Sequence, residues 1–168
     1  MTQPRNTLGD YLTDAEPVSA LWPDLVNAVY SDGPQTHIER LSPAAQVLYH
    51  TGVFCGEMVN GGISQFFSNT SGNRAHETLA ALRTIGAVLC AELLEKALTL
   101  FPDGIAPVDR WPRVDLLLAF EKRNTTFLDE LNQVFDARID ALRGTPDEDV
   151  FALELAFMQA HRSDSVLA

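Results

Sequence analysis

The stretch NGGISQFFSNTSG, residues 60–72, decides how this chain is organised, because it interrupts a long proline-free run of helix-forming sequence. Its two ends, NGG at 60–62 and SGN at 71–73, are strong signals for a turn or for the end of a helix. Glycines permit backbone angles that other residues resist, and the paired phenylalanines between the two ends can anchor a short helix in a core. The stretch therefore predicts a short segment at 63–69 between two longer helices.

Helices are predicted on both sides of this stretch, since apolar residues recur with a helical period and strand-like alternation is nearly absent. Upstream, residues 17–30 form a first helix. A second begins at Ser42-Pro43, an N-cap followed by a proline at the first helical position, and runs to Val59. Downstream, the longest helix spans about residues 75–101 and carries an apolar stripe along its length.

The last third of the chain contains three more helical stretches, at residues 113–123, at 127–143, and from a capping box at 145–148 onward. The last of them is apolar on nearly every side, so it is buried either in the core or in a subunit interface, and we favour the core. The sequence therefore predicts an all-α fold, a single-domain multi-helix bundle around the long central helix at 75–101.

Length and charge limit the possible functions. The chain has 168 residues, for which one domain is the default, and we place that domain at residues 17–162 between tails at 1–16 and 163–168. Its 23 acidic and 12 basic side chains leave a formal net charge of −11. This charge disfavours direct binding to nucleic acid or to anionic lipid, because both require lysine and arginine to meet phosphate. A basic partner and simple solubility remain open.

A cytoplasmic location is expected from the N-terminal sequence and from the cysteines. Residues 1–17 lack the basic and apolar regions of a signal peptide, and no apolar run approaches the roughly 20 residues that span a bilayer. The two cysteines, Cys55 and Cys90, lie in apolar segments. We interpret them as buried free thiols in a reducing compartment, with a redox pair as the alternative.

Residues suited to catalysis or metal binding are thinly scattered. The four histidines form no HExxH pair, the two cysteines lack the spacing of a zinc site, and neither a nucleophile elbow nor a phosphate-binding loop occurs. The sequence therefore predicts a protein that is not an enzyme, with no cofactor, no metal and no catalytic residue.

Carboxylates concentrate near the C-terminus, where residues 129–154 hold eight acids and two bases and so carry −6 of the net charge. On a helix Asp129, Asp136 and Asp140 fall on one line, with axial gaps of about 10 Å and 6 Å. That is the scale of phosphate spacing along nucleic acid, so the row can present a phosphate-like array to a basic protein. Asp147, Glu148 and Asp149 complete this candidate acidic surface. The alternative is an ordinary solvated face, with the last three acids interacting with the dipole of their own helix.

The stretch at 60–72 resembles the defining motif of the DNA-mimic-protein family, a helical domain best known from a bacterial DNA mimic. The similarity runs from about residue 42 to residue 101 and fades through 113–160, where only the helix rhythm agrees. The resemblance implies an all-α fold, no catalysis, a possible homodimer, and an acidic surface that occupies the DNA-binding face of a transcription factor or nucleoid protein. The residues that carry the motif are Asn60, Gly61, Gly62, Gln65, Phe66, Phe67, Asn69 and Gly72.

The motif itself has two interpretations. Its glycines, aromatics and amides are suited to building a turn, which makes the motif architectural. The alternative is a small-molecule or enzymatic site at Asn60, Gln65 and Asn69, since polar groups on rigid loops are often functional. An immunity or antitoxin-like module that neutralises a basic toxin is a further alternative, and it shares the electrostatics of a DNA mimic. A deep polar pocket at the motif would favour the second interpretation, and a ridge of carboxylates would favour mimicry.

Overall fold

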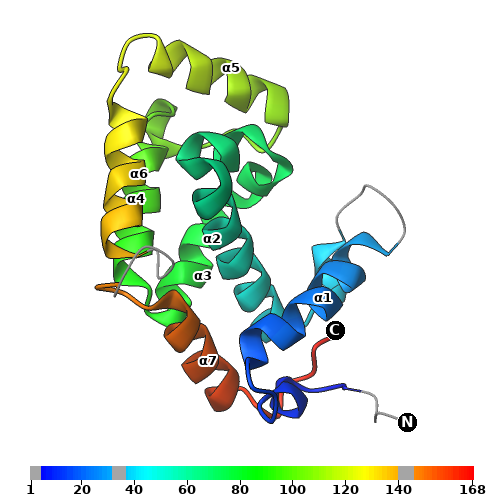
Figure 1. The fold of residues 1–168 in the computed structure, drawn as a ribbon. Coiled ribbons are helices and arrows are strands. Elements are labelled where there is room, and N and C mark those ends of the chain that lie inside the picture. The colour runs from blue at the N-terminus through cyan, green and yellow to red at the C-terminus, as the bar shows by residue number, and fades with distance from the viewer. Residues whose placement is uncertain (1–4, 32–36, 140–145) are drawn as a thin grey trace. The chain divides into compact units, whose positions relative to one another are not determined.

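A computed structural model describes residues 5–31, 37–139 and 146–168. In these ranges the regular structure is helical, with short 3-10 turns and two isolated β-bridges, which confirms the predicted all-α class. The helices are α1 (Pro17–Tyr30), α2 (Pro43–Ser68), α3 (Ala75–Ile85), α4 (Val88–Leu98), α5 (Arg110–Glu121), α6 (Phe127–Arg138) and α7 (Val150–Ala160) (Figure 1). None of the helices in the described ranges is long and apolar enough to cross a membrane.

The chain forms two compact units, of which the first comprises residues 1–49 and 150–168. It holds α1, α7 and the first turns of α2, and α1 occupies the residues predicted for it. The end of the chain lies between two other segments, since Val166 N–H donates to the Asn6 carbonyl and Ser42 N–H donates to the Val166 carbonyl. Leu8 is also buried. The described parts of the predicted tails, residues 5–16 and 163–168, therefore pack within this unit.

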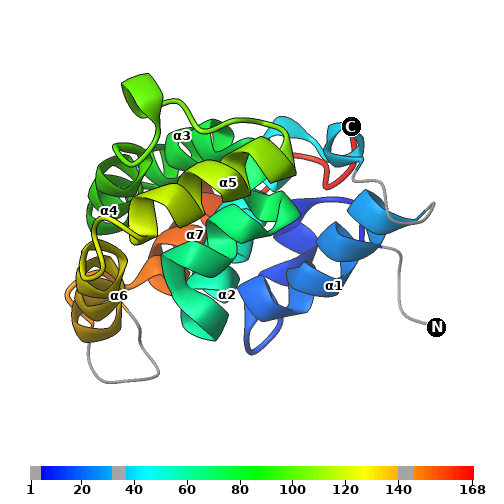
Figure 2. The ribbon, with the colours of Figure 1, turned by 90° about the horizontal axis from the view of Figure 1, so that it is seen from above.

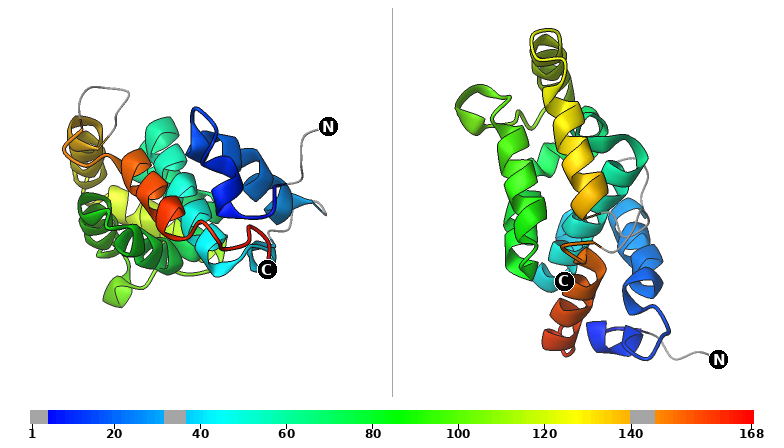
Figure 3. Two further views of the ribbon diagram at one scale, coloured as in Figure 1. Left: turned by 90° about the horizontal axis from the view of Figure 1, so that it is seen from below. Right: turned by 60° about the vertical axis from the view of Figure 1, so that its left-hand side comes forward.

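The second unit comprises residues 50–149 and has an aromatic centre. Phe54, Phe66, Phe67 and Phe101 are buried and form a chain of edge-to-face contacts, with ring centroids 4.9–5.2 Å apart. Such contacts add stabilisation beyond the burial of apolar area. The two phenylalanines of the motif thus anchor the end of α2, as predicted. In this unit α6 lies beside α4 (Figure 3).

The long central helix predicted at 75–101 is wrong, because the chain breaks at Gly86. Gly86 has φ +81°, and the N–H of Ala87 donates to the carbonyl of Leu82, which closes the C-terminus of α3. α4 then begins at Val88, and the two helices pack against each other (Figure 2). The apolar period continues across the break, so periodicity alone did not reveal it.

Other helix boundaries also differ from prediction. α2 continues past the stop expected at Asn60, and its axis breaks at Gly62, where φ is +71° and ψ is −164°. α5 begins three residues earlier than predicted, because Asp109 and not Pro112 precedes its first turn. α6 ends at Arg138, and residues 140–143 of the predicted helix lie outside the described ranges.

Burial of His50 makes the stability of the fold depend on pH. His50 on α2 is 7% exposed, and this burial lowers the pKa of its imidazole from 6.5 to about 4, while the nearby Glu77 and Arg74 act in opposite directions. Between these two pKa values the unfolded chain binds a proton that the folded protein does not. Stability is therefore lost as the pH falls through this window.

We expect the free energy of unfolding to fall by on the order of 2 kcal/mol between pH 7 and pH 5 through this histidine alone. Urea titrations at a series of pH values measure the effect. The variant His50→Gln should flatten the dependence, whereas His76→Gln, at an exposed position on α3, should leave it unchanged. Equal pH dependence in the wild type and His50→Gln would contradict this assignment.

Candidate functional site

The predicted row of acids, Asp129, Asp136 and Asp140, has two members within α6, and they differ in exposure. Asp129 is exposed, and Asp136, two turns further along the same helix, is half-buried. Both residues lie within α6, where a spacing of seven residues corresponds to a rise of about 10 Å. Asp140 lies outside the described residues. Among the described members of the predicted row, Asp129 is therefore exposed and Asp136 is partly covered.

Glu148 was predicted to belong to the acidic surface, but it is buried. Its carboxylate accepts hydrogen bonds from the backbone N–H groups of Leu89 (2.8 Å) and Cys90 (2.9 Å), and the side chain is only 9% exposed. These amides lie in the first turn of α4, whose N-cap residue Ala87 has no side-chain acceptor. A carboxylate at this end of a helix satisfies unpaired donors and interacts favourably with the helix dipole. Glu148 therefore caps α4 and does not extend the acidic surface.

Removing this cap should destabilise the protein. We expect Glu148→Ala to lower the free energy of unfolding by about 1–2 kcal/mol, because it leaves two amide donors without their acceptor. Asp129→Ala, at an exposed carboxylate without a hydrogen bond to a described residue, should change it by less than about 0.5 kcal/mol. Urea denaturation of both variants is the measurement, and equal losses would show that Glu148 is not a cap.

The two acids beside Glu148 remain on the surface. Asp147 is exposed and pairs with Arg138, with 2.7 Å between the carboxylate Oδ2 and the guanidinium Nε. Asp149 is exposed as well. The capping box predicted at 145–148 includes Thr145, which lies outside the described residues, and α7 begins only at Val150. The acids of this segment therefore do not lie in the first turn of α7.

The polar residues of the motif converge on Glu57, which the sequence analysis did not single out. The carboxylate of Glu57 accepts hydrogen bonds from Gln65 Nε2 (2.7 Å), from Asn69 Nδ2 (3.0 Å) and from Ser71 Oγ (2.7 Å). Asn60 is exposed and does not belong to this cluster. The structure thus brings Gln65 and Asn69 together, but around an internal carboxylate, without Asn60.

A second internal hub is Arg113, which is fully buried on α5. Its guanidinium donates to the carbonyls of Phe67 (2.7 Å) and Asn69 (2.8 Å) at the end of α2. It also donates to the carbonyls of Pro107 and Val108 and to Asn73 Oδ1. Desolvation lowers the pKa of Arg113, while the negative end of the α2 dipole favours its charge. Arg113 is thus a C-terminal cap for α2.

Two glycines of the motif make room for these contacts. A Cβ on Gly72 would lie 2.6 Å from Arg113 Nε and 2.9 Å from the carbonyl oxygen of Phe66. A Cβ on Gly62 would lie 2.4 Å from Oδ1 of Asn132 on α6, the same atom that accepts a hydrogen bond from the N–H of Ile63 (2.9 Å). The break in α2 therefore positions α6, the helix that carries Asp129.

The cysteines are free thiols, as predicted, although Cys55 on α2 is only half-buried. Contact with Cys55, together with burial, raises the pKa of the Cys90 thiol. Cys90 is therefore protonated at neutral pH and is a poor nucleophile. Within the described ranges, no group of three or more histidine, cysteine or acidic side chains could hold a metal ion.

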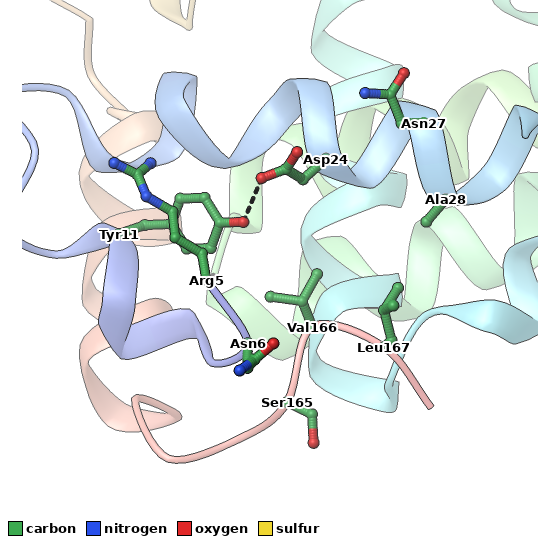
Figure 4. Close-up of a pocket in the computed structure, with 9 residues that line it drawn as sticks. All are labelled: Arg5, Asn6, Tyr11, Asp24, Asn27, Ala28, Ser165, Val166 and Leu167. Carbon is green, nitrogen blue, oxygen red and sulfur yellow. Dashed lines mark hydrogen bonds between the residues drawn. The ribbon is translucent and has the colours of Figure 1, made fainter. Parts of the chain in front are cut away.

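A pocket of about 870 Å³ lies in the first unit and contains no residue of the motif. In this pocket the hydroxyl of Tyr11 donates a hydrogen bond to the carboxylate of Asp24 (Figure 4). Its lining comes from Arg5, Asn6 and Tyr11, from Asp24, Asn27 and Ala28 of α1, and from residues 165–167. The pocket therefore gives no support to a small-molecule site at Asn60, Gln65 and Asn69.

The fold and the site define an acidic, all-helical protein whose signature motif is engaged in internal hydrogen bonds. The chain belongs to the DMP19-like protein family, whose model matches residues 39–161. No curated protein and no solved structure matches the chain. The match confirms the resemblance seen in the sequence and extends it through α5, α6 and α7, beyond the residue 101 at which the motif-based similarity fades.

Proposed function

We propose that this protein is a DNA mimic, which binds the DNA-contacting surface of a basic transcription factor or nucleoid protein in place of DNA and without catalysis. The family is named for a DNA mimic protein. The observation that carries the proposal is a set of exposed carboxylates in the second unit that have neither an ion pair nor a hydrogen bond with any described residue. We call them the free carboxylates: Glu92, Asp103, Asp109, Asp115 and Asp129.

The basic side chains of the same unit are largely engaged within it. Three arginines pair with other acids, since Arg74 lies 3.2 Å from Glu77, Arg83 lies 2.8 Å from Glu95 and Arg138 lies 2.7 Å from Asp147. Arg113 is buried against carbonyl groups, and Arg110 Nε donates to the carbonyl of Ser68. Residues 50–149 hold fifteen acidic and nine basic side chains, so this unit carries a net negative charge, and that charge attracts a surface that has evolved to meet phosphate.

The electrostatic character of such a complex predicts its behaviour in salt. Charges on an exposed surface are screened over a Debye length of about 8–10 Å at physiological ionic strength. Binding should therefore weaken as salt is added, and duplex DNA should compete for the same surface of the partner. Capture of partners from a cell extract, followed by elution with duplex DNA, tests both expectations.

A pair of variants of equal net charge sharpens the test. Neutralising free carboxylates, with Asp109→Asn, Asp115→Asn and Asp129→Asn, should weaken binding to a captured partner about tenfold, which corresponds to about 1.4 kcal/mol. Neutralising paired acids, with Glu77→Gln, Glu95→Gln and Asp147→Asn, should weaken it less. The measurement is the dissociation constant by titration calorimetry. Equal losses would show that only net charge matters, and a set of captured proteins without DNA-binding members would refute mimicry.

The other functions considered from the sequence receive less support. Gln65 and Asn69 are bonded to Glu57, so they are not available as a polar ligand site. Capture of a basic toxin that DNA does not displace would instead identify an immunity or antitoxin-like module. The homodimer and the cytoplasmic location stay predictions, and sedimentation over a range of concentrations tests the first of them.

A further inference from the structure

We propose that the exposed face of α5 centred on Trp111 is a docking surface for a cationic partner surface that contains an apolar depression. Trp111 is 69% exposed, and Leu118, on the same side of the helix two turns later, is 48% exposed. Val108, immediately before α5, is 68% exposed. Single exposed apolar residues are ordinary, but this segment exposes three large apolar side chains, Val108, Trp111 and Leu118, within eleven residues. The inference rests on the proposed function, because it specifies the surface that the partner meets.

The tryptophan is displayed on a rigid support. The guanidinium of Arg110 stacks over the Trp111 ring at 5.1 Å and is itself bonded to the carbonyl of Ser68. Arg113, two residues after Trp111, holds α5 against the end of α2 through hydrogen bonds to the carbonyls of Phe67 and Asn69. A large side chain held in place loses little conformational entropy on binding, and tryptophan and arginine are the residues that most often dominate interface energy.

Charge decides which partner this surface fits. The free carboxylates Asp109 and Asp115 flank Trp111 in the sequence, one at the N-cap of α5 and the other one turn beyond the tryptophan. In a two-fold dimer the same patch meets itself, which would bring these carboxylates of the two copies together. Lysine and arginine side chains around an apolar depression would instead pair with the carboxylates while the depression receives the indole. A basic partner is therefore favoured over a second copy.

The test uses synthetic peptides and the fluorescence of Trp111. The full-length protein carries Trp22→Phe, so that Trp111 is the single tryptophan. One probe is a helical peptide with lysines on one face and leucines on the other. The second probe replaces the leucines by glutamine at the same charge. We expect the lysine–leucine peptide to shift Trp111 emission to the blue, because the indole leaves water, and the lysine–glutamine peptide to leave it unchanged.

Variants locate the effect on this surface. Trp111→Ala, measured by calorimetry, and Asp109→Asn with Asp115→Asn should each weaken the lysine–leucine peptide about tenfold. Phe151→Ala, at an aromatic residue that is 57% exposed on α7, should not weaken it. Equal binding of both peptides, or an unchanged affinity in Trp111→Ala, would overturn the inference. A blue shift that grows with the concentration of the protein alone would also overturn it, because a second copy would then cover Trp111.

The outcome for this surface is separable from the outcome for mimicry. If duplex DNA displaces the captured partner but Trp111→Ala binds that partner as tightly as the wild type, the docking surface is refuted and mimicry stands. If the peptide and variant results hold but duplex DNA displaces no partner, mimicry is refuted and the cationic docking surface stands.

Discussion

Replacing Arg113 by methionine is expected to lower the free energy of unfolding by about 3–5 kcal/mol, which is a large share of the stability of an ordinary domain. The substitution would leave the carbonyls of Phe67 and Asn69 at the end of α2 without donors, together with three further oxygen acceptors. Each buried acceptor that loses its partner costs about 1–3 kcal/mol of folding free energy. Part of this loss is offset, because methionine carries no charged group that must be desolvated on folding.

Two further variants distinguish the loss of the hydrogen bonds of Arg113 from the general effect of removing an arginine. Arg113→Lys should also destabilise, because an ammonium group has three donors and cannot reproduce the planar fork that reaches both the end of α2 and the Pro107 segment. Arg123→Met removes an exposed arginine whose Nε donates a hydrogen bond to the carbonyl of Ala119. This variant should change the free energy of unfolding by less than about 0.5 kcal/mol. Chemical denaturation compares the three. If Arg113→Met loses no more unfolding free energy than Arg123→Met, the hydrogen bonds of Arg113 do not stabilise the fold as we expect.

Gly62→Ala should cost about 3 kcal/mol, because the site opposes a side chain in two ways. Its backbone lies at φ +71° and ψ −164°, a region that is essentially restricted to glycine. A Cβ there would also lie 2.4 Å from Asn132 Oδ1 and would displace the hydrogen bond that Ile63 donates to that atom. The break in α2 and the position of α6 both depend on this residue.

A glycine in the same helix provides a control with the opposite sign. Gly56 has helical geometry, and a Cβ on it would meet nothing within 4 Å, so Gly56→Ala should stabilise the protein by about 0.5–1 kcal/mol. Asn132→Ala removes the clash but leaves the backbone strain, so Gly62→Ala should cost less in that background than in the wild type. Thermal and urea unfolding of the four variants measure these differences. Equal costs of Gly62→Ala in both backgrounds would exclude the clash with Asn132.

Much of the helical architecture followed from local signals. α1 occupies the predicted residues 17–30, and α2 begins at Pro43, because helical periodicity and a proline at the first position act within a few residues. The break at Gly86 was missed for a related reason. The apolar period runs through the glycine, and a left-handed cap leaves no trace in that period.

The candidate site was less predictable, because burial and pairing depend on residues far apart in the sequence. Glu148 caps amides 58 and 59 residues away, and Arg113 reaches a carbonyl 46 residues away. Neither partner leaves a pattern in the neighbouring sequence. Glu57 and Gln65 lie closer together, but they meet only because α2 bends between them at Gly62.

The all-helical class, the family and the net charge could be predicted without a structure, since they depend on composition, local periodicity and a short motif. Which carboxylates face solvent depends on contacts that form only in the folded protein. In the folded protein Glu148 caps α4, Asp147 forms an ion pair with Arg138, and Glu57 accepts hydrogen bonds from the amides of the motif. Asp115 and Asp129 are exposed. The electrostatic effect of a carboxylate on a partner depends on its exposure to solvent and on the charges beside it, and both are set by how the chain folds.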